Sequence, residues 1–122
     1  MADDYTIWHN PKCSTSRFVL EALREAGVQP RVRDYQKQPP SEAELRAALT
    51  AAGIGARDLL RRKSPAYEQL GLADSSLTDD RLIAAMAARP EAIERPLVFA
   101  PDGTARLCRP KETVFEMLAA TS

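Results

Sequence analysis

The distribution of apolar residues predicts a strand, a helix and a second strand in the first part of the chain. The segment "YTIWH" (5–9) is rich in β-branched and aromatic residues and stops at the turn signal "NP", which predicts a strand. From residue 14 to about 26 the apolar side chains recur on one helix face, and Gly27 is a typical stop. The segment "RVRDYQ" (31–36) alternates like a second strand. This order predicts a βαβ unit with parallel strands.

The middle of the chain has the apolar period of helices. Ser41 and Glu44 have the spacing of a capping box before the apolar stripe of "AELRAALTAAG". Thr78 is the predicted cap of a clearer helix in "LTDDRLIAAMAARP", which has acidic residues in its first turn. We therefore expect a helical segment at about 41–93.

Two short strands and a helix are predicted at the end of the chain. The segment "PLVFAPDGTARLCRP" contains two apolar runs around "PDG", which is a hairpin signal. Pro110 is a suitable first residue for a last helix. The order β-α-β, helical insertion, β-β-α is that of an α/β thioredoxin-like fold with a mixed sheet. We expect residues 1–122 to form a single domain of this kind, with the insertion at about 41–93.

Composition limits the class of protein. The chain has 122 residues, 44% of them hydrophobic and 28% charged, which is ordinary for one globular domain. Its 17 Lys and Arg balance 17 Asp and Glu, so the sequence does not favour nucleic acid or a membrane surface as partner. With two cysteines and one histidine we expect no metal site. The chain shows neither a secretory signal pattern nor an apolar run of about 20 residues, so we expect a cytoplasmic protein with reduced thiols.

Cys13 is the residue best suited to chemistry. In "HNPKCSTSR" it lies where the first strand ends and the first helix begins. A thiolate at a helix N-terminus is stabilised by the dipole and by free N–H groups, and its pKa can fall to roughly 3.5–7.5. The same N–H groups suit an oxyanion, so Ser14 and Thr15 are candidate substrate-binding residues, and the hydroxyl of Ser16 is a further donor. The pattern also fits a half-buried cysteine at a turn with incidental serines.

Arginines at four positions are candidate anion ligands: Arg61, Arg62, Arg95 and Arg109. Arg95 and Arg109 each precede a proline at an end of the predicted hairpin, and a residue before proline is held extended. Arg61 lies in the helical segment. The planar fork of arginine suits tetrahedral oxyanions better than the point charge of lysine. Each arginine taken alone also fits a solvated surface residue, and spacing does not show that they converge.

Three further residues have possible roles beside Cys13. His9 can tune the thiolate by charge, and it equally fits a hydrogen-bonded structural residue at a strand end. Pro96 opens the first hairpin strand, where a thioredoxin-like fold carries a cis proline facing the active cysteine. Cys108 lies in a predicted strand, and we expect a core residue and not a resolving thiol.

The chain resembles the glutaredoxin-coupled arsenate reductases nearly from end to end. The segments that carry the resemblance are "YTIWHNPKCSTSR", "LLRRKSPAYEQLGLADSSLTDDRLIAAM", "IERPLVFAPDGTARLCRP" and "ETVFEML". The resemblance implies that Cys13 is the nucleophile that attacks arsenate. It implies three anion-binding arginines, which are Arg61, Arg95 and Arg109. It also implies that His9 and Ser16 tune the cysteine and that Pro96 is cis.

The resemblance further implies the reaction. Arsenate is reduced to arsenite with glutathione as co-substrate and glutaredoxin as partner, and no cofactor is bound. Ser14 stands where the best-known members have glycine, the hairpin has an extra residue, and the chain ends soon after the last predicted helix. These departures favour a shorter subgroup of the family.

Two alternatives remain at this stage. One is a glutathione-dependent thiol reductase with another substrate. The other is a binding protein, because transcription regulators of the Spx type share the fold. Those regulators typically carry Cys-x-x-Cys, whereas this chain has Ser16 in place of the second cysteine.

Overall fold

The computed structural model describes residues 5–121, which divide between two units. The first unit comprises Met1–Gln38 and Arg95–Ser122, and the second comprises Pro39–Glu94. The second unit has nearly the bounds of the predicted helical insertion. The assignment of the whole chain to one domain stays a prediction.

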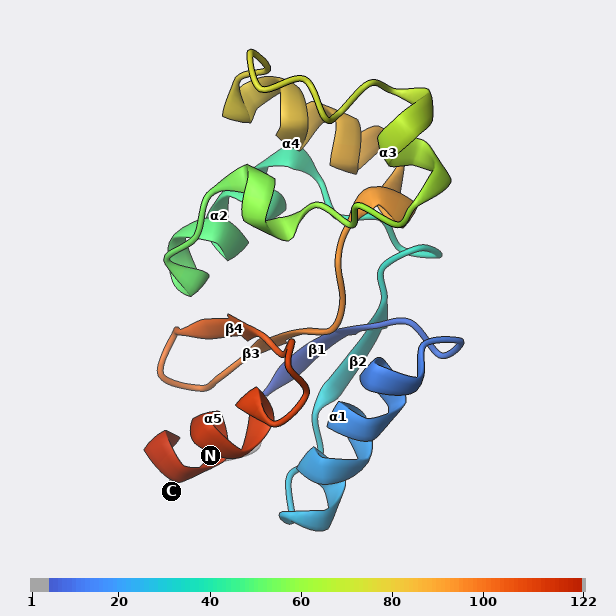
Figure 1. Cartoon of the computed structure of the whole chain (residues 1–122). Coiled ribbons are helices and arrows are strands. Elements are labelled where there is room, and N and C mark those ends of the chain that lie inside the picture. Colours follow the sequence, from blue (N-terminus) through green and yellow to red (C-terminus); the bar gives the residue numbers. More distant parts are fainter. Residues whose placement is uncertain (1–4, 122) are drawn as a thin grey trace. The chain divides into compact units, whose positions relative to one another are not determined.

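The first unit contains a four-stranded mixed sheet with the order β2-β1-β3-β4 (Figure 1). The central strand β1 (Thr6–His9) pairs in parallel with β2 (Arg31–Asp34) and antiparallel with β3 (Leu97–Phe99). The edge strand β4 (Ala105–Leu107) forms the predicted hairpin with β3. Parallel β1 and β2 need the crossover that the intervening helix provides.

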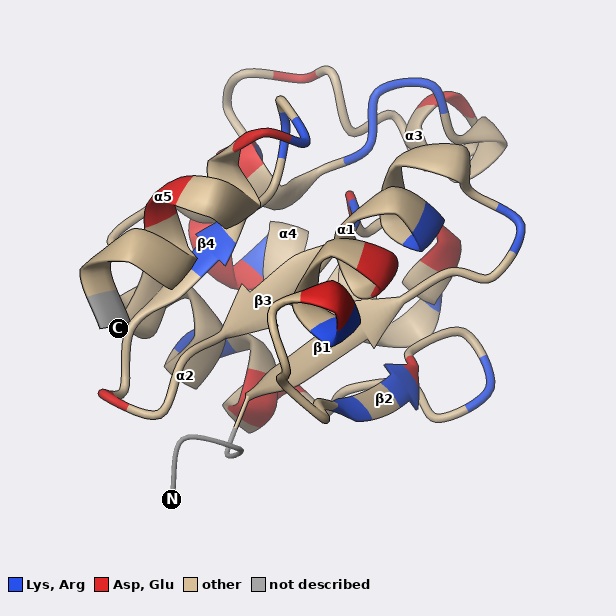
Figure 2. Cartoon of the chain, turned by 90° about the horizontal axis from the view of Figure 1, so that it is seen from below, with Lys and Arg blue, Asp and Glu red and all other residues tan. Residues whose placement is uncertain are grey.

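Two helices of the first unit, α1 (Ser14–Glu25) and α5 (Thr113–Thr121), pack against the sheet (Figure 1). Their buried side chains share one apolar cluster with residues of β1 and β3. The cluster contains Tyr5, Ile7, Val19, Leu20, Ala22, Leu23, Val28, Val98, Ala100, Cys108, Val114 and Met117. This cluster packs the middle of α1 against the sheet. The charged residues of α1, β2 and α5 are of both signs and gather in no single field (Figure 2).

Two predicted boundaries in the first unit were wrong. Strand β2 ends at Asp34, because the Asp34 carbonyl accepts the backbone N–H of Lys37 at 3.0 Å and of Gln38 at 2.8 Å, which turns the chain. Helix α5 begins at Thr113 and not at Pro110. The Pro110 carbonyl instead accepts the N–H of Thr113 at 3.0 Å, in a turn before the helix.

The second unit is helical, as predicted. It contains α2 (Glu42–Ala52), η1 (Ala56–Leu59), α3 (Pro65–Gln69), α4 (Asp79–Ala88) and η2 (Pro90–Ala92). Ser41 forms the expected capping box with Glu44, and Thr78 caps α4 by accepting the N–H of Arg81. In the part of the chain that the structure describes, no helix is both long and apolar enough to cross a bilayer.

Candidate active site

A tight turn between β1 and α1 places Cys13 at the N-cap of the helix. The backbone N–H of Cys13 donates to the Asn10 carbonyl at 3.0 Å, and the Cys13 carbonyl accepts the N–H of Arg17 at 3.0 Å. The Asn10 side chain stabilises the same turn, because its Oδ1 accepts the N–H of Lys12 at 2.9 Å. The Cys13 backbone is extended, and the N–H groups of the first helical turn are directed toward its side chain.

The surroundings of Cys13 favour the thiolate. Partial burial raises the pKa of Cys13, but hydrogen bonds to the sulfur outweigh it, so that the pKa lies below the ordinary value of a thiol. The strongest of these comes from the backbone N–H of Ser16, followed by the guanidinium of Arg95, which also contributes its charge, and the N–H of Thr15. A lowered pKa makes the nucleophilic thiolate available near neutral pH.

Ser16 connects the Cys13 turn with His9. Its side chain is fully buried, and its Oγ accepts the backbone N–H of Asn10 at 3.0 Å. The same Oγ lies 2.5 Å from Nδ1 of His9. The Asn10 N–H uses one acceptor site of the Ser16 oxygen, and the serine O–H is available to donate to Nδ1. This arrangement suits a neutral His9 that carries its proton on Nε2.

The electrostatics of His9 agree with the neutral form. Burial lowers the pKa of His9; Asp34 opposes this effect, and the charges of Arg24 and Arg17 add to it. The net result is a pKa below the ordinary 6.5. His9 therefore holds Ser16 by a hydrogen bond and does not supply a positive charge to the thiolate at neutral pH.

Arg95 is the guanidinium that acts on Cys13. It follows the second unit in the chain, directly before β3, and it is partly buried. Its Nη1 lies 3.5 Å from the hydroxyl of Tyr35, a fully buried residue just after β2. The Tyr35 hydroxyl also hydrogen-bonds the side chain of Asn10. Tyr35 thereby links Arg95 with the turn that positions Cys13.

Arg109 joins this group through Arg95. Its Nη1 donates to the Arg95 carbonyl at 3.0 Å, and its side chain is exposed. The peptide bonds Arg95–Pro96 and Arg109–Pro110 are both cis; the second of these was not expected from the sequence. The first unit thus brings Cys13, His9, Ser16, Arg95 and Arg109 into one connected group.

The other three predicted substrate-binding residues are Arg61, in the second unit, and Ser14 and Thr15, in the first turn of α1. Arg61 belongs to the second unit, where its Nη1 forms an ion pair with Glu94 at 2.8 Å and its backbone N–H donates to the Ala92 carbonyl at 2.8 Å. Ser14 is exposed at the first position of α1, and Thr15 is partly exposed. The roles of these residues in binding substrate stay predictions.

Sequence reasoning missed Asn10 and Tyr35. Asn10 was used only as half of the turn signal "NP", and Tyr35 was assigned to a strand. Both are buried and polar, with exposed fractions of 7% and 0%. One signal in the sequence could have found them: each is a polar residue directly after one of the two parallel strands. The carboxyl ends of parallel strands meet at the same sheet edge, so Asn10 and Tyr35 lie at the edge that carries Cys13.

Cys108 differs from Cys13 in its burial and in the direction in which its pKa is shifted. It is fully buried in the apolar cluster, and its Sγ lies 4.0 Å from Sδ of Met117. Burial raises the pKa of Cys108 to about 12. Both cysteines are free thiols. Among residues 5–121, no group of three or more His, Cys, Asp or Glu is arranged to hold a metal ion.

The sequence of this chain matches the model of a known protein family. The model of the ArsC family matches residues 8–117, which include the Cys13 turn and both Arg–Pro pairs. The chain belongs to the ArsC family. The resemblance found in the sequence is therefore confirmed.

Individual relatives match over nearly the whole chain. The arsenate reductase of Rhizobium meliloti (strain 1021) is 49% identical over 95% of this chain and 82% of the relative. Protein YfgD of Escherichia coli (strain K12), which is uncharacterized, is 45% identical over 97% of this chain and 99% of the relative. The solved arsenate reductase from Vibrio cholerae has a TM-score of 0.89 and 44% identity, and covers 95% of this chain and 98% of its own. The predicted thioredoxin-like α/β fold is confirmed.

Proposed function

We propose that this ArsC-family chain is an arsenate reductase in which Cys13 is the nucleophile, glutathione the co-substrate and glutaredoxin the partner. The observation that carries the proposal is the environment of Cys13, where the N–H groups of Ser16 and Thr15 and the guanidinium of Arg95 lower the thiol pKa. The same donors suit an oxyanion held in front of the sulfur. The 49% identity to a curated arsenate reductase supports arsenate as that oxyanion.

The first step is a condensation at arsenic. The Cys13 sulfur attacks arsenate, an S–As bond forms, and one arsenic-bound oxygen leaves as water after protonation. Arg95 acts on the Cys13 thiolate, and Arg109 is hydrogen-bonded to the Arg95 carbonyl. Both can neutralise the charge of the remaining oxygens. We assign Arg61 to the same role from the family resemblance. His9 and Ser16 keep the turn in the geometry that exposes the thiolate to the anion.

Two external thiols complete the reduction. The thiol of glutathione displaces a second oxygen from arsenic as water, so that arsenic carries both the Cys13 sulfur and the glutathione sulfur. A glutaredoxin thiolate then attacks the glutathione sulfur, and the electron pair of the broken S–As bond reduces arsenic from the pentavalent to the trivalent state. The products are a glutathione–glutaredoxin disulfide and, after hydrolysis of the remaining S–As bond, arsenite and free Cys13. Holding the reacting groups next to each other lowers the entropic part of the barrier.

This chemistry suits a reducing compartment. Both cysteines are free, and Cys13 must be reduced at the start of each cycle. We therefore propose a cytoplasmic location.

The test of the function is arsenite release from arsenate in the presence of glutathione, glutaredoxin and a system that reduces the disulfide. The wild type should release arsenite over many turnovers, and Cys13→Ser should release none while it unfolds at an unchanged urea concentration. A wild type that reduces a mixed glutathione disulfide but not arsenate would instead be a thiol reductase. A wild type without either activity would favour the alternative of a regulatory binding protein.

A further inference from the structure

A hollow in the first unit lies next to the Cys13 turn. Its volume is about 240 Å³, and Thr15, Arg109, Pro110, Lys111 and Glu112 line it. Thr15 belongs to the first turn of α1 and donates its N–H toward the Cys13 sulfur, so the hollow shares a wall with the nucleophile. Arg109 connects the hollow with Arg95.

The two cations of the hollow are held in place by neighbouring groups. The Arg109 guanidinium donates to the Arg95 carbonyl at 3.0 Å. The Lys111 Nζ lies 4.7 Å from the ring centroid of Phe18, a distance that gives a cation–π interaction. The Phe18 ring in turn contacts Phe115 edge to face, at 6.0 Å between centroids. A long side chain that is already oriented loses less entropy when it binds an anion.

The charges of the hollow define a ligand chemistry. Arg109 and Lys111 offer two positive groups, Glu112 offers one negative group, and the Thr15 hydroxyl can donate or accept. Glutathione has the complementary set, since it carries two carboxylates and one ammonium in addition to its thiol. Exposed Phe18, which contacts Lys111, and its neighbour Phe115 provide an apolar rim, with exposed fractions of 37% and 50%.

We propose that this hollow is the glutathione site, with Lys111 as its main carboxylate ligand. The proposal rests on the proposed function, which requires a second thiol to reach arsenic while arsenic is bound to the Cys13 sulfur. The backbone N–H of Thr15 is directed toward the Cys13 sulfur, so the two groups are neighbours at the start of α1. A tripeptide bound against Thr15 therefore has its central cysteine within reach of an adduct on Cys13.

Steady-state kinetics with Lys111 variants tests the site. Lys111→Ala should raise KM for glutathione about three- to tenfold, as expected for the loss of one charge-assisted contact at an exposed position. Lys111→Arg should stay within about twofold of the wild type, because it keeps the charge. KM for arsenate and KM for glutaredoxin should not change, since the variant leaves Arg95 and the Cys13 turn intact. A glutathione KM unaffected by Lys111→Ala would contradict the proposal, and so would an increase confined to the glutaredoxin KM.

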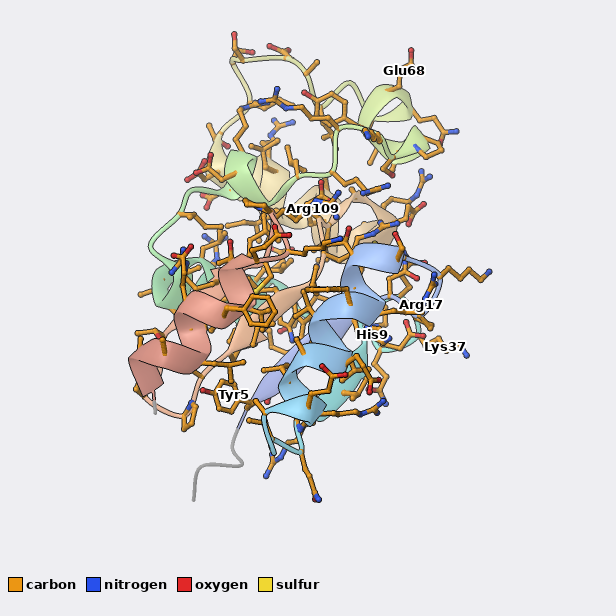
Figure 3. The ribbon with its side chains drawn as sticks, turned by 60° about the horizontal axis from the view of Figure 1, so that its bottom comes forward. Tyr5, His9, Arg17, Lys37, Glu68 and Arg109 are labelled. Carbon is orange, nitrogen blue, oxygen red and sulfur yellow. The ribbon has the colours of Figure 1, made fainter. Side chains whose placement is uncertain are left out.

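Lys37→Ala is the matched control. Lys37 is an exposed lysine of the same unit, in the turn after β2, and Figure 3 shows it well apart from Arg109. The Lys37→Ala substitution removes one positive charge from the protein and leaves the residues that line the hollow unchanged. A glutathione KM that rises equally in Lys37→Ala and Lys111→Ala would show an effect of net charge, and the proposed site would be wrong.

Direct binding separates a failure of this site from a failure of the proposed function. S-methylglutathione has no free thiol, so its binding to the reduced protein requires no turnover. In an NMR titration the amide signals of Thr15, Lys111 and Glu112 should shift in the wild type, and the shifts should weaken in Lys111→Ala. Shifts that cluster elsewhere, or none up to tens of millimolar ligand, would overturn the site. Absence of arsenite production by the wild type would overturn the function and would leave this binding result valid.

Discussion

Nδ1 of His9 lies 2.5 Å from the buried Oγ of Ser16, and the same oxygen accepts the N–H of Asn10. Ser16→Ala removes the group that both of these atoms contact. We expect a loss of about 1–3 kcal/mol in the free energy of unfolding, because two buried polar groups lose a partner. Urea denaturation followed by the fluorescence of Trp8 measures it.

Ser14→Ala is the control for this change. Ser14 is exposed two positions earlier on the same helix, so its replacement should alter stability by no more than about 0.5 kcal/mol. The backbone N–H of Ser16 remains in Ser16→Ala, and the Cys13 pKa should stay lowered. An equal loss of stability in both variants would mean that the His9–Ser16 contact contributes nothing of its own.

The titration of His9 has a defined direction. Its pKa should lie below 6.5, because burial disfavours the imidazolium and the charges of Arg24 and Arg17 add to this effect against Asp34. The unfolded chain then binds the proton more readily than the folded chain, so His9 should reduce stability as the pH falls through 6.5. The NMR signal of the single histidine reports the pKa without ambiguity. A value above 6.5 would require a charged His9 beside Ser16 and would reverse the assignment of its hydrogen bond.

Tyr35 should influence the site through Arg95. Tyr35→Phe removes the hydroxyl that lies 3.5 Å from Arg95 Nη1 and keeps the buried ring. Because the guanidinium is then less well oriented, we expect the Cys13 pKa to rise and kcat/KM for arsenate to fall about fivefold, equivalent to about 1 kcal/mol. Alkylation rates and initial velocities measure the two effects.

Tyr5→Phe is the control, since Tyr5 is also buried but precedes β1, at the end of that strand opposite the Cys13 turn (Figure 3). It should leave the Cys13 pKa unchanged. The link from Tyr35 to Arg95 would be refuted by equal effects of the two substitutions, or by no effect of Tyr35→Phe.

Cys108 should be dispensable for turnover. With a pKa raised to about 12 and no exposed surface, its thiol is a poor nucleophile. We expect Cys108→Ala to keep kcat within a few-fold of the wild type and to lose about 1 kcal/mol of stability from the small cavity. Alanine is preferable to serine here, because serine would bury a hydroxyl in the apolar cluster. Loss of turnover together with a Cys13–Cys108 disulfide in the oxidised wild type would instead indicate an internal relay.

Much of the fold was predictable because its signals are local. The end of β1 at "NP", the stop of α1 near Gly27 and the capping box of Ser41 each depend on neighbours in the sequence, and each has its counterpart in the structure. The failures concern boundaries. Pro110 was compatible with a helix start, but the chain makes one further turn before α5, and the sequence offered no means to choose between the two.

The site was predictable only in part, because its interactions are tertiary. A cysteine at a strand–helix junction was sufficient to single out Cys13. The effect of Arg95 on Cys13 joins segments that are distant in the sequence, and no periodicity encodes it. The same is true of Tyr35 and Asn10, whose polar groups meet only when β2 pairs with β1. Such pairings follow from the topology of the sheet and not from any one motif.

The pH dependence of Cys13 alkylation tests the central claim most directly. Iodoacetamide reacts with the thiolate, so the midpoint of the rate profile reports the pKa, and mass spectrometry confirms the modified residue. In the wild type the midpoint should lie below about 8.5, the ordinary value of a cysteine. Arg95→Met should move it upward, because the methionine cannot donate to the sulfur and carries no charge. A wild-type midpoint at or above about 8.5, or a profile that Arg95→Met leaves unchanged, would contradict the account of Cys13 as an activated nucleophile.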